Sequence, residues 1–190
     1  MSARPLATYV RMDEGTAEDY AIMGSYRDAH LQALPDRLLG MLVELGDKED
    51  GSPIDGFAHS LQSATLAYDD GADDDMVFAA LLHDIGQVAS VHNHAEVAAA
   101  ILKPFLSERM YWVIKHHGIF QGYYYFDKVG WDRNAREQYK DSPYYQDCVH
   151  FCERYDQVAF RRDYPTKPLT FFEPLVKRIV SQGSSVPGVT

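Results

Sequence analysis

The chain has 190 residues, of which 46% are hydrophobic, and a formal net charge of −10. This length suits one folded domain with a substantial core, so we assign residues 1–190 to a single domain. The acidic balance argues against nucleic acid as a partner, because phosphate backbones need a basic surface. No apolar run approaches the ~20 residues of a membrane helix, and the N-terminal residues lack the apolar core of a secretory signal. We therefore expect a cytoplasmic protein with no membrane contact.

The spacing of apolar residues predicts a chain that is almost entirely helical. The expected helices span residues 17–34, 37–45, 57–68, 76–85, 94–105, 108–117, 144–160 and 170–180. Residues 1–50 are a candidate lid or cap over a folded core of about residues 55–160. The fold class that follows is an all-α helical bundle.

Capping and turn residues predict where these helices begin and end. Pro35 should interrupt the first helix, and Asp36 should cap the helix that follows. Gly86 should stop the apolar helix that precedes it. Short polar side chains that should cap the other helices are Thr16, Asn93 and Ser107.

Residues 118–143 form a long, aromatic and mostly polar stretch. Long segments of this kind are commonly functional, so we expect a lid or a pocket wall here. Consecutive aromatic residues within it are Tyr123, Tyr124, Tyr125 and Phe126. A second interpretation, that these rings only pack the segment onto the core, stays open.

The sequence contains a scattered set of residues that bind metal ions well. These are His59, His83, Asp84, His94, His117 and Asp156. Imidazole nitrogen and carboxylate oxygen together suit zinc, iron and manganese, and this set is too large for one ion. Asp84 is the natural bridge between two ions, because it follows His83 at the end of an apolar helix. Other histidines, such as His30 and His150, are expected at the surface or in the core.

Short segments around these residues resemble the HD-domain superfamily. They are His59–Gln62, Leu82–Gly86, Asn93–His94, Lys115–His117 and Arg154–Asp156. Most members of that superfamily are metal-dependent phosphohydrolases, and a smaller branch are mixed-valent diiron oxygenases. Three features are similar to those of the oxygenases that cleave the carbon–phosphorus bond of 1-hydroxyphosphonates. They are the short chain, the HSLQSA segment that starts at His59, and the spacing from His83 to His117.

This resemblance implies a helical bundle with a dinuclear iron site, Fe(II)/Fe(III), in its core. One iron would take His59, His83, Asp84 and Asp156. The other would take His94 and His117, with Asp84 as the bridge. The enzyme would use O2 to convert a small-molecule 1-hydroxyphosphonate into a carboxylate and phosphate, with no catalytic side chain beyond the ligands.

The substrate pocket departs from the pattern of these oxygenases. A histidine and a lysine of their phosphonate pocket correspond here to Gln87 and Gln121, which bring no charge. Candidate positive partners are Lys128 and Arg161, with Arg133 and Arg162 beside them in the sequence. Tyr123 and Tyr124 are candidates to bind a quaternary ammonium by cation–π attraction. The resemblance then favours (R)-1-hydroxy-2-(trimethylamino)ethylphosphonate as the substrate, with glycine betaine and phosphate as products. The 2-amino analogue, which would give glycine, stays open.

Two other functions remain open at this stage. The same ligands would serve a metal-dependent phosphohydrolase acting on a nucleotide or another phosphate ester. A non-catalytic HD scaffold is the third hypothesis, although all of the ligand positions are filled. The sequence leaves the oligomeric state open.

Overall fold

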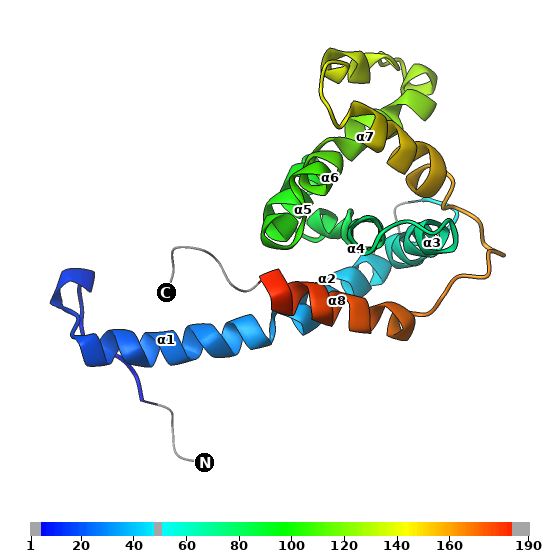
Figure 1. The fold of residues 1–190 in the computed structure, drawn as a ribbon. Coiled ribbons are helices and arrows are strands. Elements are labelled where there is room, and N and C mark those ends of the chain that lie inside the picture. Colours follow the sequence, from blue (N-terminus) through cyan, green and yellow to red (C-terminus); the bar gives the residue numbers. More distant parts are fainter. Residues whose placement is uncertain (1–4, 48–50, 184–190) are drawn as a thin grey trace.

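The structure is a computed structural model that describes residues 5–47 and 51–183. All regular elements in these ranges are helical, which confirms the predicted fold class (Figure 1). The α-helices are α1 (Ala17–Gln32), α2 (Leu34–Glu44), α3 (Gly56–Asp69), α4 (Asp74–Leu82), α5 (His94–Leu102), α6 (Glu108–Gln121), α7 (Tyr145–Phe151) and α8 (Leu169–Gly183). Short 3-10 helices span Met12–Glu14, Leu45–Asp47, Ile85–Val88, Lys103–Phe105, Gly122–Tyr124, Phe126–Val129 and Ala135–Tyr139. A π-helix, Cys152–Asp156, continues α7.

Helix α4 lies at the centre of the bundle. Its residues from Met76 to Leu82 are all buried, as their apolar sequence predicts. Burying each large apolar side chain stabilises the fold by about 1.5–3 kcal/mol. Helix α4 packs on α3, while α5 packs on α6 and on the turn Ile85–Val88. The π-helix packs on α3, so segments distant in sequence meet around the end of α4.

Three N-caps show why these helices start where they do. The Thr16 side chain accepts a hydrogen bond from the Asp19 amide and forms a capping box, as predicted for α1. The Ser107 side chain accepts from the Met110 amide and caps α6, again as predicted. Asp73 caps α4 by accepting from the Met76 amide, with further acidic residues in the first turn.

The first helix is interrupted near Pro35 as predicted, at Ala33, but the predicted cap at Asp36 was wrong. Helix α2 begins at Leu34, and Pro35 lies in its first turn, where the missing N–H would have no partner within the helix. Asp36 also lies in the first turn, and α2 has no side-chain cap. The helix breaks at Ala33, and the proline lies just inside the helix that follows.

The boundaries near the His83-Asp84 pair also differ from the prediction. Helix α4 ends at Leu82, and Gly86 lies in the 3-10 helix that follows. Gly86 is needed for close packing, because a Cβ there would lie 2.0 Å from the backbone oxygen of His94. Asn93 precedes α5 without a side-chain cap, and its Oδ1 accepts a hydrogen bond from Ser90 Oγ at 2.5 Å.

Two helices later in the chain differ in length from the prediction. Helix α6 continues past His117 to Gln121. The helix expected over residues 144–160 is α7 followed by the π-helix, which ends at Asp156. The segment between α6 and α7 forms a lobe at one end of the molecule (Figure 1).

Helix α1 extends away from the other helices (Figure 1). It contacts α2, while α2 itself packs on α8 and buries Leu38, Leu39 and Leu42. A lid function for residues 1–50 stays a prediction, and residues 1–4 and 48–50 lie outside the described ranges. Within the described ranges, no helix is both long enough and apolar enough to span a membrane.

We expect Gly86→Ala to destabilise the protein by about 1–3 kcal/mol, because its Cβ would collide with the α5 backbone. Gly40→Ala is the control, since a Cβ at Gly40 meets nothing within 4 Å. That change should stabilise α2 by about 0.5–1 kcal/mol. Denaturant unfolding measures both effects, and equal stability of the two variants would contradict the close packing.

Candidate metal centre

The six predicted metal ligands come together around the end of α4. His59 comes from α3, His117 from α6 and Asp156 from the π-helix, while His94 is the first residue of α5. His83 and Asp84 follow α4 directly. Except for His94, whose side chain is 25% exposed, these residues are buried. A water-excluding site therefore forms where five separate segments meet.

Backbone carbonyls fix the orientation of all four imidazole rings. The Nδ1 atoms lie 3.0 Å from the Ala159 oxygen for His59, 2.9 Å from Ala80 for His83, 3.1 Å from Val91 for His94, and 2.7 Å from Ile114 for His117. A carbonyl can only accept, so each Nδ1 carries the hydrogen that it donates. In the neutral ring, the Nε2 lone pair is then free to bind a cation.

The first group of converging atoms is the more deeply buried one. The Nε2 atoms of His59 and His83 lie 3.2 Å apart. Asp156 Oδ1 lies 3.3 Å from Nε2 of His59 and 3.7 Å from Nε2 of His83. Asp84 Oδ2 lies 3.4 Å from Nε2 of His83 and 3.8 Å from Nε2 of His59. We call these four residues the closed group.

The second group contains the partly exposed histidine. The Nε2 atoms of His94 and His117 lie 3.3 Å apart. Asp84 Oδ1 lies 3.3 Å from Nε2 of His94 and 3.4 Å from Nε2 of His117. We call these three residues the open group. Asp84 belongs to both groups, with one carboxylate oxygen directed to each.

These donor atoms are arranged as ligands of a metal ion rather than as hydrogen-bond partners of one another. Two neutral Nε2 lone pairs repel at 3.2 Å unless a cation or a proton lies between them. Ligands about 2.1 Å from one ion and at right angles are separated by about 3 Å, close to the spacings here. Asp156 Oδ2 is buried and has no hydrogen-bond partner among the described residues. Both groups could therefore hold a metal ion.

The histidines and carboxylates shift one another's pKa values in the metal-free protein. Burial opposes ionisation of Asp84, but the charge on His83 outweighs it and holds the pKa of Asp84 well below its usual value. The pKa of Asp156 is also lowered, since hydrogen bonds from His59 and His83 overcome its burial. Both carboxylates are therefore ionised at neutral pH and available to a cation.

A π-helix positions Asp156. Single π-helical turns inside helices are rare and are frequent at functional sites. Gln121 Nε2 donates a hydrogen bond to Asp156 Oδ1 at 2.5 Å, and Cys152 Sγ donates to the His117 carbonyl at 3.5 Å. The structure thus shows Gln121 supporting a residue of the closed group, while its predicted contact with substrate stays a prediction.

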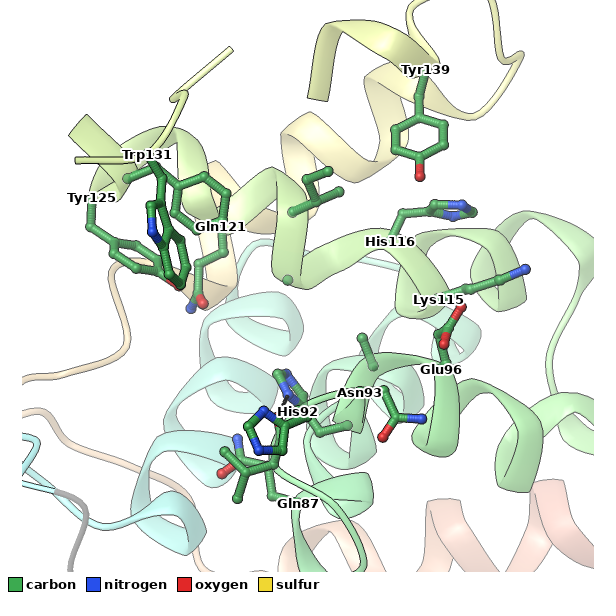
Figure 2. A pocket seen from close by; sticks show the side chains of 16 residues that line it. Gln87, His92, Asn93, Glu96, Lys115, His116, Gln121, Tyr125, Trp131 and Tyr139 are labelled. Carbon is green, nitrogen blue, oxygen red and sulfur yellow. Dashed lines mark hydrogen bonds between the residues drawn. The ribbon is translucent and has the colours of Figure 1, made fainter. Parts of the chain in front are cut away.

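A cavity of about 840 Å³ adjoins the open group. It is lined on one side by Gln121, Tyr125, Phe126 and Trp131, and Gln87 and His94 also line it. Figure 2 shows Tyr125, Trp131 and Gln121 close together, with Lys115, Glu96 and His116 at the other end. A small molecule in this cavity would reach the open group through His94.

The structure separates the other predicted substrate residues. The Tyr123 ring is stacked against two guanidinium groups, with Arg133 at 4.2 Å and Arg136 at 3.6 Å from its centroid. Tyr124 lines a smaller cavity of about 290 Å³ together with Gln121. Lys128 is exposed at the surface. Arg161 is also exposed, and its Nε lies 3.6 Å from Asp163.

Sequence reasoning missed two kinds of cavity residue. Trp131 is 63% exposed and lines the cavity beside Phe126, at a ring distance of 5.2 Å. It lies in the aromatic segment predicted as a pocket wall, which was the available signal. Lys115 and Glu96 bring one charge of each sign to the cavity, and their spacing in the sequence gave no indication of this.

Comparison with known proteins agrees with this arrangement. A family model for the HD domain matches residues 56–156, a range that contains both groups of the metal centre. The chain is also 26% identical over 175 residues to the (1-hydroxy-2-(trimethylamino)ethyl)phosphonate dioxygenase (glycine-betaine-forming) of Leisingera caerulea. That similarity covers 75% of this chain and 88% of the relative.

The pH dependence of stability should differ between metal-free and metal-loaded protein. Burial opposes the charged form of His59 and His83, but Asp156 and Asp84 outweigh it and raise both pKa values above 6.5. The stability that these protons contribute is complete below pH 6.5 and is lost as the pH rises through the folded-state pKa. Metal binding instead needs deprotonated Nε2 atoms, so it strengthens with pH.

We therefore expect Tm of the metal-free protein to fall as the pH rises above 6.5. The increase in Tm on adding Fe(II) without oxygen should grow over the same range. Calorimetry of chelator-treated and iron-loaded protein measures both trends. A metal-free Tm that rises with pH in this window would contradict the assigned proton positions.

Proposed function

The chain belongs to the HD domain family, and on that premise we propose that it is a mixed-valent diiron oxygenase acting on a 1-hydroxyphosphonate. The reaction would use O2 to cleave the carbon–phosphorus bond and would release a carboxylate and phosphate. The observation that carries this proposal is the division of the Asp84 carboxylate between two groups of histidines. The similarity to a phosphonate dioxygenase supports the reaction class.

The closed and open groups would each hold one iron ion. The closed group offers four protein ligands, and the open group offers three, next to the cavity. When bound, the iron pair would supply O2 activation and a Lewis acid for the substrate oxygens. Because the open group has fewer ligands and an exposed histidine, the substrate would bind on that side. The buried closed group would be shielded from water.

Neutral polar side chains would orient the phosphonate end of the substrate. Gln87 and Gln121 both line the cavity near the open group. Their amides can donate hydrogen bonds to phosphonate oxygens without adding charge. The cavity therefore combines a metal face with amide donors, and the exposed Lys128 and Arg161 are less favourable candidates for this contact.

An aromatic corner of the cavity would receive the cationic end of the substrate. The rings of Tyr125 and Phe126 lie 5.0 Å apart, and those of Phe126 and Trp131 lie 5.2 Å apart. A quaternary ammonium placed against such faces gains about 0.5–2 kcal/mol for each contact. Tyr123 is less suitable, since guanidinium groups already stack on its ring. We propose (R)-1-hydroxy-2-(trimethylamino)ethylphosphonate as the substrate and glycine betaine as the organic product.

The test compares iron-loaded protein with and without O2. We expect phosphate release from the 1-hydroxyphosphonate only when O2 is present, together with glycine betaine in equal amount. Nucleotides and simple phosphate esters serve as controls for a phosphohydrolase. Phosphate release from those esters without O2 would refute the oxygenase and favour hydrolysis at the same ligands.

His59→Ala should remove a ligand of the closed group. We expect at least about a 100-fold loss of turnover and a lower iron content, with helicity retained, because ligand loss exceeds the effect of altering outer contacts. His30→Ala is the matched control, since His30 lies on α1 and is exposed. Normal turnover in His59→Ala would contradict the ligand set, as judged by product formation, iron analysis and circular dichroism.

Trp131→Ala should weaken binding of the quaternary ammonium. The loss of one contact of about 0.5–2 kcal/mol corresponds to about a 2- to 30-fold increase in KM. KM for the 2-amino analogue should change less, because a primary ammonium keeps its own hydrogen bonds to water. Val129→Ala, an exposed residue of the same segment, is the control. Equal changes for both substrates would argue against the aromatic corner.

A further inference from the structure

A short segment after the π-helix touches His59 in two ways. The Ala159 carbonyl accepts the hydrogen bond from His59 Nδ1 at 3.0 Å. The Phe160 ring stacks on the imidazole, with centroids 4.6 Å apart and planes inclined by 25°. The first contact fixes the tautomer of His59, and the second fixes the plane of its ring. The position of residues 159–161 therefore determines where His59 Nε2 points.

Gln62 holds this segment through both ends of its amide. Its Nε2 donates to the Arg161 carbonyl at 2.8 Å, and its Oε1 accepts from the Arg161 amide at 3.0 Å. Gln62 is only 2% exposed, so these hydrogen bonds are shielded from water. The Arg161 side chain, in contrast, is 60% exposed. The backbone of this residue is therefore held by the buried amide of Gln62 rather than by its own side chain.

His59 and Gln62 lie on the same face of α3, because residues three apart are neighbours on a helix. One helix therefore carries both the imidazole and the side chain that anchors its hydrogen-bond acceptor. Gln62 holds residue 161 of this segment, and residues 159 and 160 of the same segment contact His59. The Ala159 amide also donates a hydrogen bond to the Asp156 carbonyl at 3.1 Å, so both the π-helix and Gln62 hold this segment.

We propose that Gln62 is a positioning residue that sets the orientation of His59 for metal binding in the closed group. This inference rests on the proposed function, in which His59 is an iron ligand. Gln62 touches neither metal nor substrate in this scheme and acts through Ala159 and Phe160. Its amide cannot be replaced by a charged or apolar side chain without losing at least one of its two hydrogen bonds.

A neighbouring residue provides a matched control for a general structural role. Thr65 lies one turn further along α3 and is also buried. Its Oγ1 accepts a hydrogen bond from the Lys167 amide at 3.1 Å and donates to the Leu61 carbonyl at 2.7 Å. Thr65→Val thus removes the hydrogen bond between α3 and the Lys167 amide, which lies later in the same chain segment. It leaves residues 159–161 and His59 untouched.

The experiment titrates metal-free protein with Co(II), whose visible absorption reports coordination. Gln62→Met keeps the length of the side chain and removes both hydrogen bonds. We expect it to weaken the tighter class of Co(II) site about tenfold, a loss typical of altered outer contacts, and to leave the weaker class unchanged. Thr65→Val should leave both classes unchanged, although both variants lower Tm.

A second measurement needs no metal. Nitrogen-15 NMR of the metal-free protein at mildly alkaline pH should show a slowly exchanging Nδ1 proton on His59 in the wild type and in Thr65→Val. In Gln62→Met this proton should exchange faster. Three results would each overturn the positioning role. They are unchanged Co(II) affinity in Gln62→Met, equal losses of Co(II) affinity in both variants, and unchanged Nδ1 exchange in Gln62→Met. Failure of the wild type to bind metal would instead refute the proposed function, and the NMR comparison would still decide the role of Gln62.

Discussion

The structure depends most on the buried carboxylate of Asp84, which faces two pairs of imidazole nitrogens at once. A second carboxylate, Asp156, lies in the same core. Burying negative charges without partners would cost several kcal/mol each, so the surrounding cationic groups or bound metal ions must compensate. Five chain segments converge on this point, and their packing around α4 is what brings the required donors together.

The two groups differ in how they meet solvent, and this difference connects the fold to chemistry. The closed group is backed by the core, by Phe160 and by the segment that Gln62 holds. The open group borders a cavity through His94. In the proposed function, the closed group would hold one metal ion away from solvent, and the open group would hold the ion that a substrate approaches. The proposed zwitterionic substrate rests on the neutral amides and aromatic rings that line this cavity.

Sequence patterns predicted the parts of the site that depend on local order. The apolar stretch before His83-Asp84 indicated a buried helix, and the histidines on either side indicated a metal cluster. Caps such as Thr16 and Ser107 were recognisable from side-chain chemistry alone. The aromatic segment before Pro143 was predicted as a pocket wall, and Tyr125 and Phe126 do line the cavity.

Features that depend on tertiary contacts could not be predicted in this way. Gly86 has the sequence signature of a helix stop, but its role is to let α5 approach closely. The π-helix that turns Asp156 inward has no simple sequence signal. Tyr123 resembles its neighbours in sequence, yet arginines that follow it in the lobe cover its ring. The pairing of Gln121 with Asp156 likewise appears only when α6 and the π-helix meet.

The most direct measurement of the central claim is electron paramagnetic resonance of iron-loaded protein combined with iron analysis. If Asp84 bridges two metal positions, saturation should give two iron ions per chain, and partial oxidation should give the signal of a spin-coupled Fe(II)/Fe(III) pair. A single iron ion per chain at saturation, or only the signal of isolated high-spin Fe(III), would contradict a bridged dinuclear centre.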